Sequence, residues 1–257
     1  MWKIKMKNFI KNYWKHLLLF ALAGLVGGFL AGLDLLASYP REIQEQILAQ
    51  CMNETMLAIV TGVQYAGYGL VLGVIGIILA KKIGLWNDSL ALKPKSLAIT
   101  VVLFVICGIL FIGIDYYVFG RLIPPVADSY LVKPTAATIL GAIILGGVVE
   151  EVMLRLFMMS LLAFVLLKIF KNCDERGREI ILVVSNVVSA MLFAAAHLPT
   201  TAMLFGITPV ILVRCFLLNG GFGLVFGWLY RKHGIQYAMI AHGGIHLVSK
   251  VIWLIFI

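Results

Sequence analysis

Long apolar runs dominate this chain and leave few ways for it to fold. Only 13% of its 257 residues are charged, 62% are apolar and the mean hydropathy is +1.02, far outside the range of a soluble domain. Each run holds about 18 residues or more, which is long enough for a helix to cross the ~30 Å hydrocarbon core of a bilayer. We therefore expect an all-α, polytopic transmembrane helical bundle of about seven helices, or eight if one long run is split. The runs lie near residues 17–37, 56–80, 97–118, 135–168, 180–197, 209–230 and 235–257.

The 21 Lys and Arg residues are spread unevenly over the connections between these runs. One alternating set of connections carries fifteen of them, the opposite set carries three, and three lie within the runs. Because cytoplasmic loops collect Lys and Arg, this bias predicts a cytoplasmic N-terminus. The same bias explains most of the net charge of +9, so no nucleic-acid partner is needed to account for it. The sequence also has no recognisable nucleic-acid-binding motif, and we expect no nucleic acid as a partner. The short connections favour a multi-pass protein of the cell membrane, with the lipid bilayer around it.

No Pro/Ser-rich linker, charge block or soluble-sized insertion divides the sequence. We expect a single integral membrane domain, 1–257, in which residues 1–134 form N-terminal scaffold helices and residues 135–257 form a catalytic helix core. This division assumes that the intramembrane acids and histidines lie only after residue 149. The two halves lack the matching interruptions of inverted-repeat transporters, which disfavours an ion- or proton-coupled transporter.

Glu150, Glu151 and Arg155 stand inside the fourth apolar run. An ionised side chain in hydrocarbon costs at least ~2.5–3.5 kcal/mol, so such residues normally face a polar interior and serve chemistry or ion transfer. Glu151 and Arg155 are four residues apart and share a helix face, which predicts an ion pair that orients the site. Glu150 points about 100° away, and an unpaired, desolvated Glu is suited to act as a base.

Three of the five histidines, His197, His242 and His246, lie in or at the end of apolar runs. His242 and His246 are four residues apart, so both rings share a helix face and are able to bind a metal or polarise a carbonyl. A zinc peptidase helix carries Glu directly after its first His, whereas this chain has Gly243. Zinc held by Glu150 and the three histidines is compatible with the ligand types but disfavoured, and we expect no cofactor.

A polar turn centred between residues 173 and 174 predicts a hairpin of two antiparallel helices. Glu150 and His197 lie at nearly equal chain distances from that centre, so they are expected to meet at one level. The run 135–170 would be ~54 Å long as one helix, which predicts a kink near Gly146-Gly147 or a projection into the cytoplasm. We favour a protruding hairpin, with a site that opens toward the cytoplasmic leaflet.

Three short motifs follow one another inside the hydrophobic runs. They are Glu-Glu-x-x-x-Arg at residues 150–155, Phe-x-x-x-His at residues 193–197, and a last motif that begins at His242. Together with the segment 222–230 they resemble the intramembrane glutamic proteases of the CPBP, or Abi-type, family, which is related to CAAX prenyl endopeptidases and bacteriocin-immunity proteins. The resemblance covers about residues 140–250. One departure is His246, because the family usually has Asn or Asp four residues after the last-motif histidine.

The resemblance implies an intramembrane endopeptidase. Glu150 would act as general base together with His197, and the activated water would attack a peptide carbonyl without a covalent intermediate. His242 would stabilise the oxyanion, as would His246 where an imidazole N–H replaces the usual amide. No metal is implied.

The same resemblance gives Glu151 and Arg155 the role of holding this geometry, with Phe193 packed beneath it. The substrate would be a membrane-associated peptide or protein, lipidated or not. Two alternatives stay open: the transporter already considered, and a non-catalytic peptide-binding or bacteriocin-immunity protein of the same fold.

Overall fold

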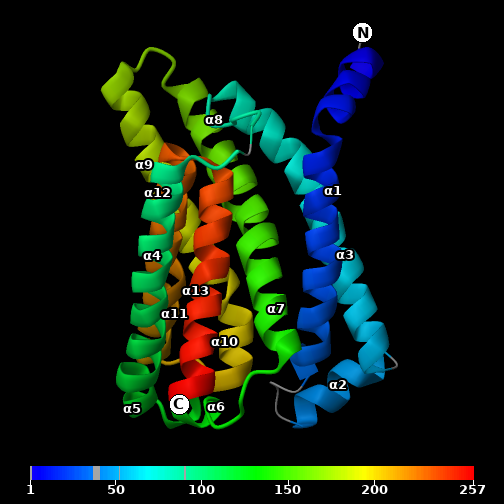
Figure 1. The fold of residues 1–257 in the computed structure, drawn as a ribbon, viewed down its shortest axis with the longest axis vertical. Coiled ribbons are helices and arrows are strands. Elements are labelled where there is room, and N and C mark those ends of the chain that lie inside the picture. The colour runs from blue at the N-terminus through cyan, green and yellow to red at the C-terminus, as the bar shows by residue number, and fades with distance from the viewer. Residues whose placement is uncertain (1, 37–40, 52, 90) are drawn as a thin grey trace.

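Seven long apolar helices run side by side in the computed structural model, which describes residues 2–36, 41–51, 53–89 and 91–257 (Figure 1). These described residues contain no strand, so the predicted all-α polytopic bundle is confirmed. The helices long and apolar enough to span a membrane are Asn8–Asp34, Glu54–Lys82, Pro94–Leu122, Ala136–Ile169, Glu175–Phe205, Pro209–Lys232 and Ile235–Phe256. The described residues therefore form seven spans, the smaller of the two numbers predicted from the apolar runs, which were seven and eight.

The elements before residue 130 are α1 (Trp2–Leu35), α2 (Arg41–Cys51), α3 (Glu54–Lys82), α4 (Pro94–Gly113), the π-helical η2 (Ile114–Phe119), α5 (Gly120–Leu122) and α6 (Pro124–Ser129). Those of the fourth and fifth spans are α7 (Ala136–Ile144), the π-helical η3 (Leu145–Glu150) and η4 (Val152–Met159), α8 (Ser160–Ile169), α9 (Glu175–Ala196) and α10 (Leu198–Phe205). The last two spans are built from α11 (Pro209–Cys215), the π-helical η5 (Phe216–Gly221), α12 (Phe222–Lys232) and α13 (Ile235–Phe256).

Several helix ends are fixed by local sequence. Asn53 caps α3 by accepting from the Met56 backbone N–H at 2.9 Å, and Thr135 begins α7 with a capping box. Between α12 and α13 the chain reverses at Gly234, whose φ of 119° is strained for any residue with a side chain. These caps and turns keep the spans antiparallel with short connections.

Helices α1 and α3 approach closely because glycine lines their contact. A Cβ on Gly24 would lie 2.3 Å from the Tyr65 carbonyl oxygen, and one on Gly69 would lie 2.5 Å from that of Phe20. Small residues at such positions let helix backbones pack in a bilayer, where the hydrophobic effect contributes little between helices. The glycine spacing in the sequence is therefore used for packing.

The fourth span changes its winding at the glycine pair. It begins as α7 and becomes π-helical at Leu145, directly before Gly146 and Gly147, and returns to α geometry at Ser160. The wider turn leaves backbone carbonyls open, and the Ser189 hydroxyl of α9 donates to the Leu154 carbonyl at 2.6 Å. The irregularity falls where the sequence predicted one, and the α8–α9 connection also extends beyond the ends of α4 and α12 (Figure 1).

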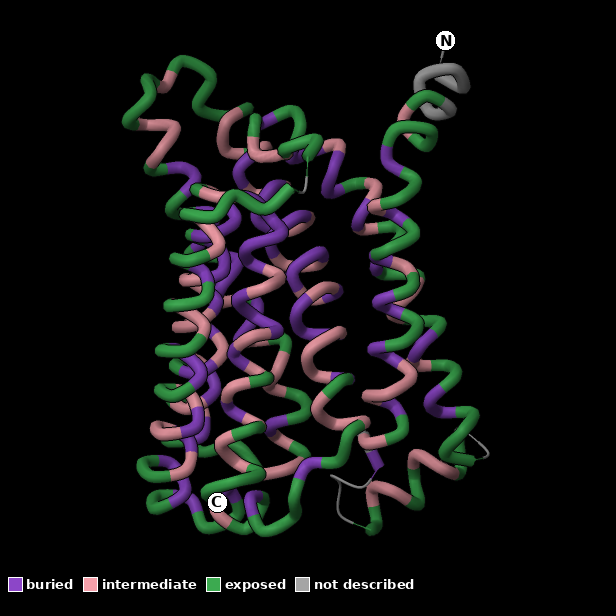
Figure 2. The backbone as a smooth tube through the Cα atoms, in the orientation of Figure 1, coloured by how far each residue is buried: buried purple, intermediate pink, exposed green. Residues whose placement is uncertain are grey.

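Buried residues gather around η4, α12 and α13, whereas the outer helix faces are exposed and apolar (Figure 2). The bundle has two distinct ends. One holds the start of α1, residues 83–89, residues 170–174 and the turn at Gly234, and is called the basic end here. The other holds α2, α5, α6, α10 and the C-terminus, and is called the opposite end (Figure 1).

Candidate active site

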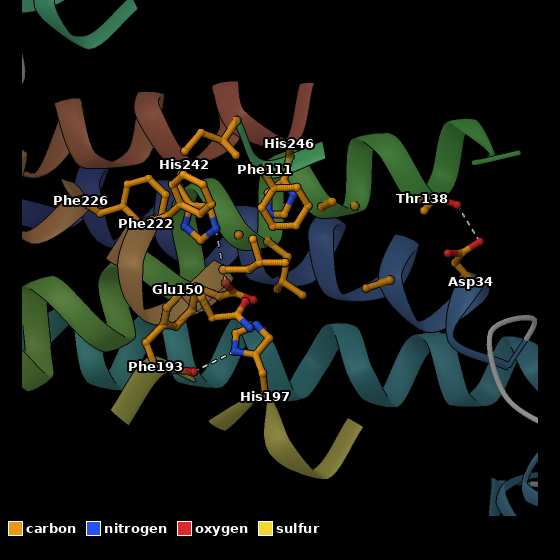
Figure 3. A pocket seen from close by; sticks show the side chains of 18 residues that line it. Asp34, Phe111, Thr138, Glu150, Phe193, His197, Phe222, Phe226, His242 and His246 are labelled. Atoms are coloured by element: carbon orange, nitrogen blue, oxygen red, sulfur yellow. Dashed lines mark hydrogen bonds and ion pairs between the residues drawn. The ribbon is translucent and has the colours of Figure 1, made fainter. Parts of the chain in front are cut away.

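A cavity of about 340 Å³ lies between the spans and collects most of the predicted site residues. Glu150 enters it from η3, His197 from the end of α9, and His242 and His246 from α13. Figure 3 shows the Glu150 carboxylate pointing into this space, between the rings of His242 and His197. The remaining wall is mostly apolar, with Phe193, Phe222 and Phe226 among its residues. The structure therefore brings the residues of all three motifs to one place.

The predicted ion pair between Glu151 and Arg155 is present and fully buried. Arg155 Nη1 lies 3.2 Å from Glu151 Oε1, and the two side chains are 1% and 0% exposed. A second guanidinium nitrogen, Nη2, donates to the Gly223 carbonyl at 3.0 Å. The guanidinium also lies 4.6 Å from the ring centre of Phe193 and 5.3 Å from that of Phe226. Arg155 thus joins η4, α9 and α12 behind the cavity wall.

His242 is held from both sides. Its Nδ1 lies 2.9 Å from Glu151 Oε1, and its Nε2 lies 3.8 Å from Glu150 Oε2. The ring stacks on Phe226 at 4.4 Å and on His246 at 5.0 Å between centres. Because a carboxylate oxygen only accepts, Nδ1 carries the proton in this contact and Nε2 faces Glu150. The direct contact between Glu151 and His242 was not predicted from the sequence.

His197 ends α9 and has its own fixed orientation. Its Nδ1 lies 2.8 Å from the Phe193 carbonyl oxygen, one helical turn earlier, and its ring stands edge-on to the Phe193 ring at 4.7 Å. The carbonyl is an acceptor, so Nδ1 donates and the neutral ring keeps an unprotonated Nε2. That nitrogen is the one able to take a proton from water. The Phe-x-x-x-His spacing therefore serves a backbone hydrogen bond as well as ring packing.

Glu150 differs from Glu151 in its surroundings. Its side chain is 24% exposed, while that of Glu151 is 0% exposed. The backbone beside it must be glycine, because a Cβ on Gly146 would lie 2.8 Å from His246 Nε2 and 3.2 Å from His242 Nε2. The glycine at the π turn thus leaves the space that the two histidines of α13 occupy.

Some wall residues were missed by sequence reasoning. Asp34 of α1, Phe111 of α4, Thr138 of α7 and Asn219 of η5 also line the cavity, and the Thr138 hydroxyl donates to Asp34 Oδ1 at 2.8 Å. The assumption that intramembrane acids lie only after residue 149 is wrong, since Asp34 ends the first span and Asp115 lies in the third. An acid at the end of an apolar run was a signal available in the sequence. Helices α1 and α4 therefore contribute to the wall as well as to the scaffold.

A second cavity of about 630 Å³ extends the first one. The two share Asp34, Phe111, Thr138, His197, Leu218 and Asn219. The second continues past α10 to α6 and the connection 132–135, which lie at the opposite end of the bundle. The expected opening on the side of the protruding hairpin is therefore wrong, because the accessible space leads away from the α8–α9 connection. His197 follows 22 helical residues that start at the basic end, which places it deep toward the other end.

The metal hypothesis finds no arrangement of ligands in the part of the chain that the structure describes. Among those residues, no group of three or more His, Cys, Asp or Glu side chains is placed to hold a metal ion.

Fold and site together define a class: multi-pass helical membrane proteins with a buried glutamate and histidine centre. Residues 132–248 match the family model described as type II CAAX prenyl endopeptidase Rce1-like. The match covers less than half of the chain, and within this segment it confirms the family resemblance of the motifs. The matched segment runs from the start of the fourth span into α13 and contains all three motifs. Comparison with curated proteins gives no match, and comparison with solved structures gives none either.

Proposed function

We propose that this protein is an intramembrane glutamic endopeptidase that hydrolyses a peptide bond of a membrane-associated protein or peptide. The observation that carries the proposal is the convergence of the Glu150 carboxylate, the free Nε2 of His197 and the Nε2 of His242 on one cavity. All three groups are oriented by contacts that do not involve a substrate. Such a preorganised set is what water activation and oxyanion stabilisation require.

In the proposed reaction, a water between Glu150 and His197 loses a proton as its oxygen attacks the peptide carbonyl carbon. Either acceptor serves, because the carboxylate and the unprotonated His197 Nε2 face the same cavity. The proton then passes to the leaving amine when the carbon–nitrogen bond breaks, and the carboxylate is regenerated. No covalent intermediate with the enzyme forms.

His242 is proposed to stabilise the oxyanion through its Nε2. That role requires a proton on both ring nitrogens, since Nδ1 already donates to Glu151. With His242 in this cationic form, the two glutamates are balanced by Arg155 and His242, and the buried group has no net charge. A preorganised donor of this kind typically lowers the barrier by ~2.7–4 kcal/mol. His246 stacks against His242 and is placed to supply a further donor.

The test uses the full chain purified and reconstituted in liposomes with a membrane-peptide library, with cleavage followed by mass spectrometry. We expect the wild type to cut a subset of peptides and Glu150→Gln to cut none. Glu175→Gln is the matched control, because Glu175 is exposed in the first turn of α9 and far from the cavity. Cleavage by Glu150→Gln at the wild-type rate would contradict the proposal.

Two further arms separate the alternatives. Loss of cleavage with EDTA and its return with zinc would replace the glutamate and water mechanism by a zinc mechanism. Proton movement by the wild type without cleavage of any peptide would favour the transporter. Tight peptide binding without cleavage would favour a binding or immunity protein of the same fold.

A further inference from the structure

A third cavity, of about 390 Å³, lies at the basic end of the bundle, between the end of α3, the end of α8 and the start of α9 (Figure 1). It shares no lining residue with the two cavities described above. Four cations and two acids line it, which leaves its wall with a net charge of +2. These residues are Lys82, Lys168, Lys171 and Arg178, with Asp174 and Glu175.

The cations of this wall lack the carboxylate partners that other cations at the same end have. Lys81 pairs with Asp88 at 3.0 Å, and Lys232 pairs with Glu179 at 2.7 Å. Among the described residues, no carboxylate oxygen lies within 4 Å of a cationic nitrogen of the wall. The positive charge of the third cavity is therefore not neutralised by direct ion pairs.

Two of these cations meet at one aromatic ring, although they belong to different helices. The Nζ atoms of Lys82 and Lys168 lie 5.2 Å and 4.7 Å from the ring centre of Phe164. The face of the ring attracts each ammonium group, but the two groups repel each other. Arg178 Nη2 donates to the Ile83 carbonyl, which fixes a further cation at the same cavity. An anion bound among these groups would offset their mutual repulsion.

The rest of the wall is apolar and lies where the fourth span ends. Phe164, Leu167 and Phe170 line the cavity, and Phe170 is 55% exposed. The neighbouring Ile169, the last residue of that span, is 65% exposed. Basic pockets between helices at the membrane surface bind the headgroups of anionic lipids. Cations beside exposed apolar side chains suit a ligand that carries both a phosphate and acyl chains.

We infer that the third cavity binds the phosphate headgroup of an anionic phospholipid, whose acyl chains pass along Phe164 and Leu167. The lipid would join α3, α8 and α9 at the basic end. The fourth span carries Glu150, and α9 leads to His197, so the same helices also position the candidate active site. The lipid site does not depend on the proposed endopeptidase function or on the face of the membrane at which the basic end lies.

The test is native mass spectrometry of the full chain in detergent micelles, with phosphatidylglycerol as the probe. Phosphatidylcholine with the same acyl chains is the comparison, because its headgroup carries the phosphate without net charge. We expect the wild type to retain phosphatidylglycerol about tenfold more tightly than phosphatidylcholine. Equal retention of the two lipids would overturn the inference.

The variant Lys82→Gln with Lys168→Gln is expected to weaken phosphatidylglycerol binding at least about tenfold, since each Lys near an anionic lipid contributes roughly fivefold. The matched control is Lys93→Gln with Lys95→Gln, which removes the same charge from exposed positions at the same end but outside the cavity. The control should bind as the wild type does, and equal weakening by both double variants would contradict the inference. If the first double variant does not fold, Lys168→Gln alone should weaken binding roughly fivefold, and unchanged binding would contradict it equally.

A second arm separates the lipid from free phosphate. Inorganic phosphate in large excess is expected to leave phosphatidylglycerol bound, because it lacks the acyl chains. Displacement of the lipid would mean that the phosphate group alone is the ligand, and would overturn the lipid assignment. Thermal unfolding gives an independent readout, since a ligand that binds only the folded chain stabilises it. Phosphatidylglycerol should raise the Tm of the wild type and of the control, and leave that of the Lys82 and Lys168 variant unchanged.

Discussion

Replacing Arg155 by Met should destabilise the protein far more than replacing Arg155 and Glu151 together. Arg155→Met leaves the Glu151 carboxylate, which is 0% exposed, buried with His242 as its remaining partner. It also removes the donor to the Gly223 carbonyl and the cation between Phe193 and Phe226. Breaking a buried pair by removing one partner typically costs about 3–5 kcal/mol, on the order of a 10²–10⁴-fold change in the folding equilibrium.

The double variant Glu151→Gln with Arg155→Met removes both charges and leaves a neutral amide of nearly the same shape beside His242. Replacement of a whole buried pair is often close to neutral. We therefore expect the double variant to recover at least ~1 kcal/mol relative to Arg155→Met, a coupling within the usual range for contacting residues. The double variant still loses stability because a methionine at position 155 cannot donate to the Gly223 carbonyl. A buried acceptor left without a donor costs about 1–3 kcal/mol.

The assay is reversible unfolding of the purified chain in mixed detergent micelles, followed by fluorescence of its five tryptophans. The four proteins of the cycle are the wild type, Glu151→Gln, Arg155→Met and the double variant. Equal stability of Arg155→Met and the wild type, or a double variant no more stable than Arg155→Met, would refute the reasoning. Either result would mean that the Glu151 carboxylate is solvated or protonated in the folded protein.

Three other perturbations give distinct readouts. His246→Asn should keep peptide cleavage and flatten the acid side of the pH–rate profile, because an amide donor does not titrate; an unchanged profile would argue against a donor role. Gly146→Ala should lower kcat at least tenfold, since its Cβ would displace His246 and His242, whereas Gly113→Ala, which meets nothing within 4 Å, should leave kcat unchanged. Hydrogen bonds from Tyr13 and Lys81 lower the pKa of Asp88, so the stability it adds is present at neutral pH and is lost as pH falls through that lowered pKa. Acid unfolding followed by tryptophan fluorescence should show this loss in the wild type, and Asp88→Asn should lack it.

The sequence predicted those features that depend on one helix at a time. Seven spans followed from run length, and the pairing of Glu151 with Arg155 followed from their spacing of four residues. The Glu151 and Arg155 side chains meet at 3.2 Å even though Arg155 lies in the π-helical segment η4. Periodicity along a chain fixes which side chains share a face, and in these two cases that was sufficient.

Of the features that depend on two helices, spacing predicted the meeting of Glu150 with His197 but not the contact of Glu151 with His242. The 2.9 Å contact of Glu151 with His242 joins residues 91 positions apart, and no pattern within either helix encodes it. The opening of the cavity was predicted on the wrong side, because run length says nothing of where side chains leave space. Asp34 was not predicted as a site residue because its hydrogen bond comes from Thr138, which lies on another helix and 104 positions away in the sequence.

The adjacent glutamates illustrate how one turn of helix assigns two roles to one residue type. Glu151 points to the protein interior, where Arg155 and His242 surround it, while Glu150 points to the cavity and is 24% exposed. Arg155 balances the negative charge of Glu151. The cation nearest to the Glu150 carboxylate is then His242 in its protonated form. In the proposed mechanism the water proton neutralises Glu150 or charges His197 as the oxyanion forms, so negative charge moves onto the oxyanion, and a proton on His242 Nε2 would face it. The Glu151 carboxylate accepts from Nδ1 and would stabilise the doubly protonated ring that this role requires, so the proposed roles of Glu151 and Glu150 both depend on His242.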